Sequence, residues 1–279
     1  MHSPEELRLR VEIYLNELEL TLELGQLGEA VRYSLLGGGK RIRPVLALAT
    51  AEALEVDVDH MLAAACSVEL VHTFSLVHDD LPALDDDDLR RGQPSCHAKY
   101  GEAVAILVGD ALLAEALRLA LLYETPEVAR ELTDATLGMI GGQYIDITSE
   151  AQLDSDGLVE LHRLKTGKLL AAPIGCALAV AGVTPNEQRP WRTFAAELGL
   201  LFQIVDDILD ATETAEQLGK TPGKDEAAGK VTYVTLHGID RARQLADDAR
   251  SRIEKELAGI PANTSSLYEI VATIRERRT

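Results

Sequence analysis

Residues 200–210 read LLFQIVDDILD, a stretch in which polar and apolar side chains recur with the period of an α-helix. Its apolar residues indicate that the helix packs into a core. Carboxylates that share one helix face repel one another unless a cation lies among them, so the pattern favours Mg2+ shared with a phosphorylated ligand over a solvated acidic face. The polar members, which follow the i, i+3, i+4, i+7 rule, are Gln203, Asp206, Asp207 and Asp210.

A second acidic pattern lies at residues 76–88, which read LVHDDLPALDDDD. Asp79 and Asp80 end a long apolar helical run, and a proline just beyond them disturbs the helix, so Asp85 is expected on an irregular turn. An acidic run alone is more often a solvated surface. Here two arginines follow at once, and fixed acids beside paired arginines suit a metal-bound diphosphate better.

Cations recur in three other segments. Lys40 and Arg43 follow a glycine run at 37–39, Lys165 lies inside an apolar helical run, and a lysine-containing glycine segment follows at 219–230. An unpaired ammonium is costly to bury, so Lys165 is expected to meet an anion. The glycine run lacks the preceding strand and the spacing of a nucleotide-binding P-loop, and we reject that interpretation.

The composition favours packed helices. Apolar residues make up 46% of the 279 residues and aromatic residues only 4%, while no linker-like segment interrupts the chain. We therefore expect an all-α fold in a single domain, residues 1–279, with Ser3 and Pro4 starting the first helix and no strand hairpin. Helical periods predict helices at 4–24, 28–36, 44–53, 59–80, 101–123, 126–150, 156–181, 186–211, 230–257 and 264–278.

Charge, cysteine usage and hydropathy exclude several classes of protein. A net charge of −19 disfavours nucleic acid and anionic membranes as partners. The longest apolar run, Leu169–Val183, is too short to span a bilayer, and the N-terminus lacks an apolar signal core, so we expect no integral membrane span and a cytoplasmic location. Cys66, Cys96 and Cys176 are widely spaced and are expected to be reduced thiols.

Taken in order, these motifs resemble the trans-isoprenyl diphosphate synthase family, most closely the bacterial farnesyl and geranylgeranyl diphosphate synthases. The resemblance covers about Leu35 to Val234 and is weak outside it. Several motifs in the right order are far more specific than any one. The matching segments are GGGKRIRP at 37–44, ELVHTFSLVHDDLPALDDDDLRRGQP at 69–94, HAKYGEAVAILVGDALL at 97–113, KTGKL at 165–169, FQIVDDILD at 202–210 and LGKTPGKD at 218–225.

The resemblance implies a bundle of about ten or more helices around a deep central cavity, a homodimer, and three Mg2+ ions per active site. It assigns metal binding to Asp79, Asp80, Asp85, Asp206, Asp207 and Asp210. The allylic diphosphate would meet Arg90, Lys165, Thr166, Gln203 and Lys220, and isopentenyl diphosphate would meet Lys40, Arg43, His72 and Arg91. The residues that take part in catalysis would be Asp79, Asp80, Asp85, Lys165, Gln203 and Asp206.

The implied reaction ionises the allylic C–O bond, adds the isopentenyl double bond to the cation and passes a proton to the departing diphosphate. Phe74, five residues before Asp79, would form a floor that limits product length. With the two extra residues between Asp80 and Asp85, this resembles farnesyl diphosphate synthases. An ideal helix places Phe74 about 140° around from Asp79, so the floor rests on the family and not on helix geometry. Geranylgeranyl diphosphate is the competing product.

Two other classes are weighed against this one. A class I terpene cyclase shares helices and one aspartate-rich motif, but does not need the second motif or the cations Lys40, Arg43 and Arg91. An inactive regulatory partner of a synthase would have lost acids or cations from one cluster, and this sequence retains them. A structural role for His72 also stays open.

Overall fold

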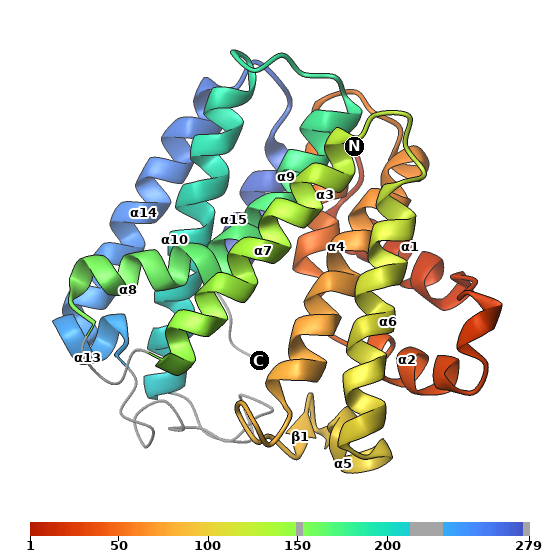
Figure 1. The fold of residues 1–279 in the computed structure, drawn as a ribbon. Helices are drawn as coiled ribbons and strands as arrows, with labels where there is room; N and C mark the ends of the chain where they lie inside the picture. The colour runs from red at the N-terminus through yellow and green to blue at the C-terminus, as the bar shows by residue number, and fades with distance from the viewer. Residues whose placement is uncertain (149–152, 213–230, 276–279) are drawn as a thin grey trace.

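The computed structural model of the chain describes residues 1–148, 153–212 and 231–275 (Figure 1). Across these residues the regular secondary structure is helical apart from one short hairpin, which confirms the all-α expectation. The α-helices are α1 (Pro4–Glu17), α2 (Leu27–Leu35), α3 (Ile42–Ala53), α4 (Val58–Asp79), α5 (Cys96–Tyr100), α6 (Glu102–Ala120), α7 (Glu127–Thr148), α8 (Ser155–His162), α9 (Lys168–Val180), α10 (Gln188–Thr212), α13 (Tyr233–His237), α14 (Ile239–Gly259) and α15 (Ser265–Arg275). The other elements are the single turns η1 (Leu22–Leu24) and η2 (Arg163–Gly167) and the strands β1 (Leu89–Arg90) and β2 (Gln93–Pro94).

Helix α1 begins as its sequence predicts but ends earlier. Ser3 caps the helix, Pro4 takes its first position, and Glu6 completes a capping box with Ser3. The predicted helix continued to residue 24, whereas α1 ends at Glu17. The reason is a long-range contact: the Arg32 guanidinium of α2 donates to the carbonyl oxygen of Leu18 at 2.7 Å and so caps the helix end.

A hydrophobic core extends through the bundle and includes buried side chains from α1 to α15. Helices α3, α4 and α9 are its central members, because most of their residues are buried on every side. Within the described ranges α4 is the one helix long and apolar enough to cross a bilayer, and 67% of its apolar window is buried inside the bundle.

Two further features differ from the predicted helices. Strands β1 and β2 pair antiparallel between α4 and α5, with Arg90 opposite Gln93. The predicted helix at 230–257 is divided into α13 and α14 at Gly238, whose φ of 78° ends the first helix. Residue 230 itself lies outside the described ranges.

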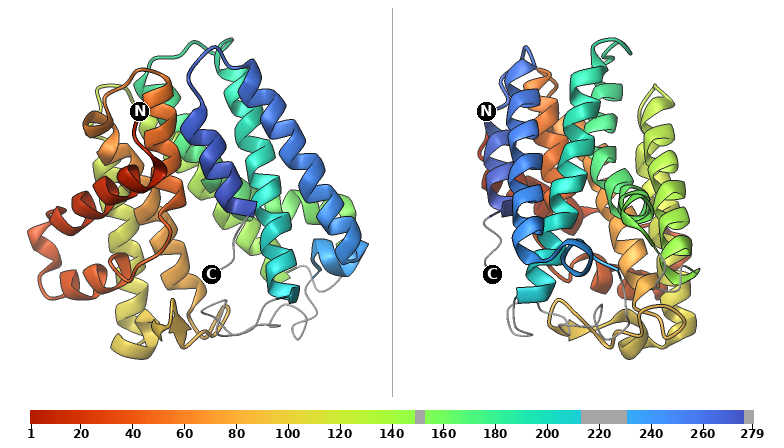
Figure 2. Two further views of the ribbon diagram at one scale, coloured as in Figure 1. Left: turned by 180° about the vertical axis from the view of Figure 1, so that it is seen from behind. Right: turned by 90° about the vertical axis from the view of Figure 1, so that its left-hand side faces the viewer.

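Helices α4 and α10 carry the two acidic motifs, and both run toward the same end of the bundle. Figure 2 shows the orange C-terminal end of α4 and the teal C-terminal end of α10 at the lower edge in both views. The hairpin β1–β2 lies at this end as well (Figure 1). The fold therefore brings two sequence motifs more than a hundred residues apart to one end of the molecule.

Candidate active site

The acidic loop after α4 folds back onto the helix end. The backbone N–H of Asp85 donates to the carbonyl oxygen of Asp79 at 2.8 Å, and that of Asp87 donates to the carbonyl oxygen of Asp80 at 3.1 Å. Burial raises the pKa of Asp79 to about 6, Lys165 opposes the shift, and the nearby Asp85 adds to it. Partly desolvated carboxylates gathered in this way favour a cation between them.

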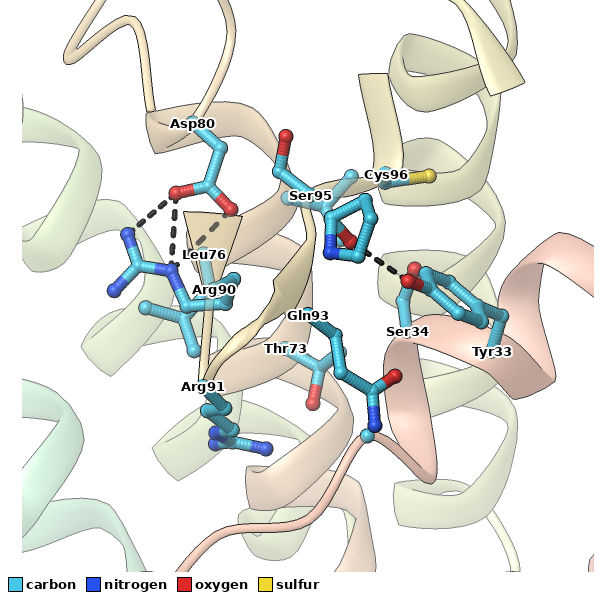
Figure 3. A pocket seen from close by; sticks show the side chains of 13 residues that line it. Tyr33, Ser34, Thr73, Leu76, Asp80, Arg90, Arg91, Gln93, Ser95 and Cys96 are labelled. Carbon is cyan, nitrogen blue, oxygen red and sulfur yellow. Dashed lines mark hydrogen bonds and ion pairs between the residues drawn. The ribbon is translucent and has the colours of Figure 1, made fainter. Parts of the chain in front are cut away.

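Asp80, which is buried, and Arg90, which is partly exposed, form an ion pair beside this loop. Asp80 is 2% exposed, and the Arg90 Nε lies 3.0 Å from its Oδ1. Burial raises the pKa of Asp80, and the Arg90 guanidinium works against that shift. Figure 3 shows this pair at a small pocket behind the hairpin, to which Thr73 of α4 and Ser34 of α2 also contribute. Arg90 thus anchors the hairpin to the end of α4.

Arg91, the next residue, contacts the loop after α2 instead of the end of α4. Its guanidinium donates to the carbonyl oxygen of Gly38 in the loop after α2. It also packs against Gly39, where an added Cβ would lie 2.7 Å from the Arg91 Cζ. Gly39 has a φ of 122°, so this position needs glycine both for its backbone and for the close approach.

His72 lies among the arginines that the sequence assigns to one anion site. Burial lowers its pKa well below the usual range, and Arg43 and Arg91 lower it further. The imidazole is therefore neutral at neutral pH. The Arg43 Cζ lies 5.9 Å from the centre of the Phe202 ring on α10, which places the start of α3 against that helix. Lys40, the remaining predicted ligand of this anion site, is exposed to solvent.

The Lys-Thr-Gly segment forms the π-helical turn η2 between α8 and α9. The Lys165 Nζ donates to Asp146 Oδ2 at 2.6 Å, so the predicted anion is a carboxylate of α7. The Thr166 hydroxyl donates to Gln203 Oε1 on α10 at 2.9 Å. Because π-turns often occur at functional sites, this local widening of the helix supports a functional role for the segment.

Two glycines allow the neighbouring helices to approach this turn. A Cβ on Gly142 of α7 would lie 2.2 Å from the backbone nitrogen of Lys165. A Cβ on Gly199 of α10 would lie 3.0 Å from the Gly167 Cα. Both helices therefore contact the backbone of η2 directly, and these contacts fix the position of Lys165 and Thr166 between α7 and α10.

Asp207 holds Gln203 in place. The Gln203 Nε2 donates to Asp207 Oδ1 at 2.8 Å, and the backbone N–H of Tyr233 donates to Asp207 Oδ2 at 2.8 Å. Asp207 is only 6% exposed, whereas Asp206 and Asp210 on the same helix are more accessible. A metal-binding role for Asp207 stays a prediction, but in this structure both of its oxygens accept bonds from protein donors.

The oxygen donors at this end of the bundle fit one particular kind of Mg2+ site. In the ranges that the structure describes, no three His, Cys, Asp or Glu residues form a closed metal cage. Mg2+ in diphosphate enzymes is bound through one or two carboxylates together with phosphate oxygens and water, so an all-protein cage is not required. The carboxylates of α4 and α10 suit that arrangement. Lys220, a predicted diphosphate ligand, lies outside the described residues.

Two residues that the sequence analysis missed take part in this region. Asp146 pairs with Lys165, and Arg41 ties the glycine loop to the helices behind it. The segment GGQYID at 141–146 offered a signal for the first, because Gln143 and Asp146 share one helix face. Arg41 offered none, since its partners lie 28 and 29 residues away.

Comparison with known proteins agrees with this geometry. Residues 25–272 match the family described as Polyprenyl synthetase. Geranylgeranyl pyrophosphate synthase 3, chloroplastic, from Arabidopsis thaliana is 44% identical over 261 residues, which cover 88% of this chain and 72% of that protein.

Solved structures are similar over almost the whole chain. Geranyltransferase from Legionella pneumophila has a TM-score of 0.85 at 32% identity, covering 98% of this chain and 96% of its own. Geranyltransferase from Helicobacter pylori, complexed with magnesium and isoprenyl diphosphate, has a TM-score of 0.85 at 33% identity, covering 98% of this chain and 95% of its own.

These likenesses define the protein as a transferase, and more closely as a prenyltransferase. The chain belongs to the polyprenyl synthetase family, as its motifs predicted.

Proposed function

We propose that the protein condenses isopentenyl diphosphate head to tail with dimethylallyl or geranyl diphosphate to give trans farnesyl diphosphate. The observation that carries this proposal is the meeting of two acidic helix ends, on α4 and α10, with the Lys165-Thr166 turn. A terpene cyclase does not need the second acidic motif or a separate cationic site.

The allylic diphosphate would lie between the acidic helix ends. Asp79, Asp85 and Asp206 would hold three Mg2+ ions there together with Asp80, Asp207 and Asp210. Bound Mg2+ would neutralise the diphosphate and so favour its departure. Lys165 and Arg90 would contact the same diphosphate. The Gln203 amide, fixed by Thr166 and Asp207, would face the carbon that becomes cationic.

Isopentenyl diphosphate would lie in the arginine-rich site without metal. Arg43, Arg91 and Lys40 supply the positive charge, and a neutral His72 donates or accepts a hydrogen bond without adding to the charge. The proton lost after condensation leaves on the departing diphosphate, so no protein nucleophile or dedicated base is required. Apolar walls would exclude water from the cation.

Product length is the finer part of the proposal. Phe74 is buried, and its ring meets the His78 ring edge to face at 4.9 Å between centres. The imidazole in turn lies 3.1 Å from the carbonyl oxygen of Ile106 on α6. An aromatic ring held in this way supports a floor one and a half turns before Asp79. Geranylgeranyl diphosphate is the second candidate, because the relative from Arabidopsis thaliana is named for that product.

Truncation of the ring tests the floor. Phe74→Ala is expected to lengthen the main product by at least one five-carbon unit, because removal of the ring leaves space for a longer chain. The products are resolved by carbon number with mass spectrometry. Phe194→Leu, which alters another buried phenylalanine, on α10, is the matched control and is expected to keep the product length. An unchanged product from Phe74→Ala would place the floor elsewhere.

The activity itself is tested by incubating the purified protein with Mg2+, isopentenyl diphosphate and, separately, dimethylallyl, geranyl or farnesyl diphosphate. Mainly fifteen-carbon product supports the whole proposal. A main product of twenty carbons or more supports the proposed reaction but contradicts farnesyl diphosphate as its product. Absence of condensation with every starter contradicts the proposed activity.

We propose further that the protein forms a homodimer through α6 and α7. Large apolar side chains are exposed on both helices, among them Leu107 of α6 and Leu137 and Tyr144 of α7, the last two at 63% and 65%. Exposed apolar side chains of this density favour an interface. Sedimentation at micromolar concentration tests this, and a monomer would contradict it.

The cytoplasmic location stays a prediction, since the plant relative is named chloroplastic.

A further inference from the structure

Arg41 occupies an unusual place between the two cations of the glycine loop. It follows Lys40, precedes Arg43 by two residues and directly precedes the first residue of α3. Its backbone is left-handed, with φ 50° and ψ 34°, a conformation that costs energy for a residue with a Cβ. Although it carries a charge, the residue is only 2% exposed. A strained backbone and a buried charge persist only when the surroundings hold both.

The guanidinium of Arg41 holds three other helices at once. Its Nε donates to Glu12 Oε1 of α1 at 2.9 Å, and one terminal nitrogen donates to Glu69 Oε1 of α4 at 2.7 Å. The other terminal nitrogen donates to the carbonyl oxygen of Leu35, the last residue of α2, at 2.8 Å. All three guanidinium nitrogens therefore have acceptors, and the segment that starts α3 is tied to the bundle from the inside.

The hydrogen-bonded group around Arg41 is connected on both sides to residues of the proposed isopentenyl diphosphate site. Glu69 lies three residues before His72 and so lies on nearly the same face of α4. On the other side, Arg91 of the hairpin bonds the carbonyl oxygen of Gly38 in the same loop. The loop that carries Lys40 is thus fixed to α4 by one arginine and to the hairpin by another.

Electrostatics agrees with a supporting role for Arg41. Its two carboxylate partners raise its pKa against the effect of burial, so it stays charged and paired. Its charge is also among those that lower the pKa of His72, after Arg43, Arg91 and Arg90. Because Glu12 and Glu69 both accept hydrogen bonds from Arg41, its guanidinium is already bonded within the protein, which suits a supporting residue.

We propose that Arg41 is a positioning residue for the isopentenyl diphosphate site: through Glu69 and Glu12 it fixes Lys40 and Arg43 at the spacing that a metal-free diphosphate requires. This inference rests on the proposed function, since it concerns the second substrate of that reaction. It predicts a much larger effect on isopentenyl diphosphate than on the allylic diphosphate. The allylic site is built from α4, the loop after it, Arg90, α10 and η2, and within that set Arg41 bonds only to Glu69 of α4.

The experiment compares full-length Arg41→Lys and Arg41→Gln with the wild type by calorimetric titration of isopentenyl diphosphate in EDTA. Arg41→Gln is expected to weaken binding at least about tenfold, because it leaves Glu69 buried without its partner and releases the loop. Arg41→Lys keeps the charge but cannot meet two carboxylates and a carbonyl at once, so an intermediate loss is expected. In the steady state, KM for isopentenyl diphosphate rises alike, while KM for the allylic diphosphate stays within about twofold.

Arg192→Gln is the matched control. Arg192 of α10 pairs with Glu131 of α7 at 2.8 Å and likewise joins two helices, but it does not touch the glycine loop. It is expected to lower stability without changing either KM. If Arg41→Gln does not fold, Glu69→Gln removes the charge of the same ion pair from the other side and is expected to weaken isopentenyl diphosphate binding selectively.

Unchanged isopentenyl diphosphate affinity in the folded Arg41 or Glu69 variants would overturn the inference, as would equal losses for both substrates. The two proposals are separable: a wild type that binds isopentenyl diphosphate in EDTA but condenses nothing contradicts the proposed activity, while the effect of Arg41 is still measured by titration. A wild type that condenses the two substrates with Mg2+ but does not bind isopentenyl diphosphate in EDTA contradicts the metal-free site, and with it the role of Arg41, and leaves the proposed activity standing.

Discussion

Asp79→Asn and Asp206→Asn are each expected to lower kcat by about a hundredfold to a thousandfold, the scale of losing one essential group that stabilises transition-state charge. The two residues lie on α4 and α10, at the same end of the bundle. If both helix ends hold the metal ions that bind one diphosphate, loss of either carboxylate disables the site. Mg2+ titration of the residual activity is expected to show a weakened metal dependence for both variants.

Stability is expected to change in the opposite direction at Asp79. Burial raises the pKa of this carboxyl to about 6, so at pH 7.5 the folded protein holds a charge where its surroundings favour the neutral form. The folded-state pKa lies above the unfolded value, so this cost is present above pH 6 and is relieved as the pH falls. Asn removes the charge, and Asp79→Asn is therefore expected to keep or raise Tm at pH 7.5.

Asp134→Asn is the control for both variants, because Asp134 is exposed on α7. It is expected to leave kcat and Tm unchanged. Circular dichroism of all three proteins checks that the helices persist. Normal turnover in both Asp79→Asn and Asp206→Asn would contradict the two-cluster metal site, and normal turnover in one alone would restrict the metal ions to the other helix.

The sequence predicted the fold well where periodic patterns are long. The acidic face of α10 follows the helical period over several turns, and the apolar run of α4 is too long for a buried strand. The hairpin β1–β2 escaped because each strand has two residues, too few to alternate. Its turn consists of Arg91 and Gly92, whose φ angles are 53° and 74°, and a left-handed backbone is uncommon for an arginine.

The site was predictable as a set of residues but not as a set of pairs. Asp80 and Arg90 were both recognised, yet their ion pair depends on the folding back of the loop between them. Lys165 was expected to meet an anion because it lies among apolar residues, but its partner Asp146 lies on another helix. The local sequence pattern identifies Lys165 as a residue that needs an anionic partner. Which carboxylate serves as that partner depends on how the helices pack.

Two adjacent glycines of α7 offer the sharpest test of that packing. Gly142→Ala is expected to destabilise the protein by about 1–3 kcal/mol, because its Cβ would lie 2.2 Å from the backbone nitrogen of Lys165 and neither main chain can yield easily. The strain falls on η2, so Lys165 and the Thr166 hydroxyl are displaced from Asp146 and Gln203. Turnover is therefore expected to fall by about a hundredfold, well beyond the loss expected from stability alone.

Gly141→Ala is the matched control, because an added Cβ there meets no atom of the same chain within 4 Å. Sedimentation of this variant checks that the proposed dimer persists, since Gly141 shares a helix face with Leu137 and Tyr144. Alanine favours a helix over glycine, so this variant is expected to gain about 0.5–1 kcal/mol and to keep full activity. Thermal unfolding and kcat are measured on both proteins at a temperature where each is folded. If the two substitutions behaved alike, α7 would not press on the Lys-Thr-Gly turn, and the placement of Lys165 would have to come from Asp146 alone.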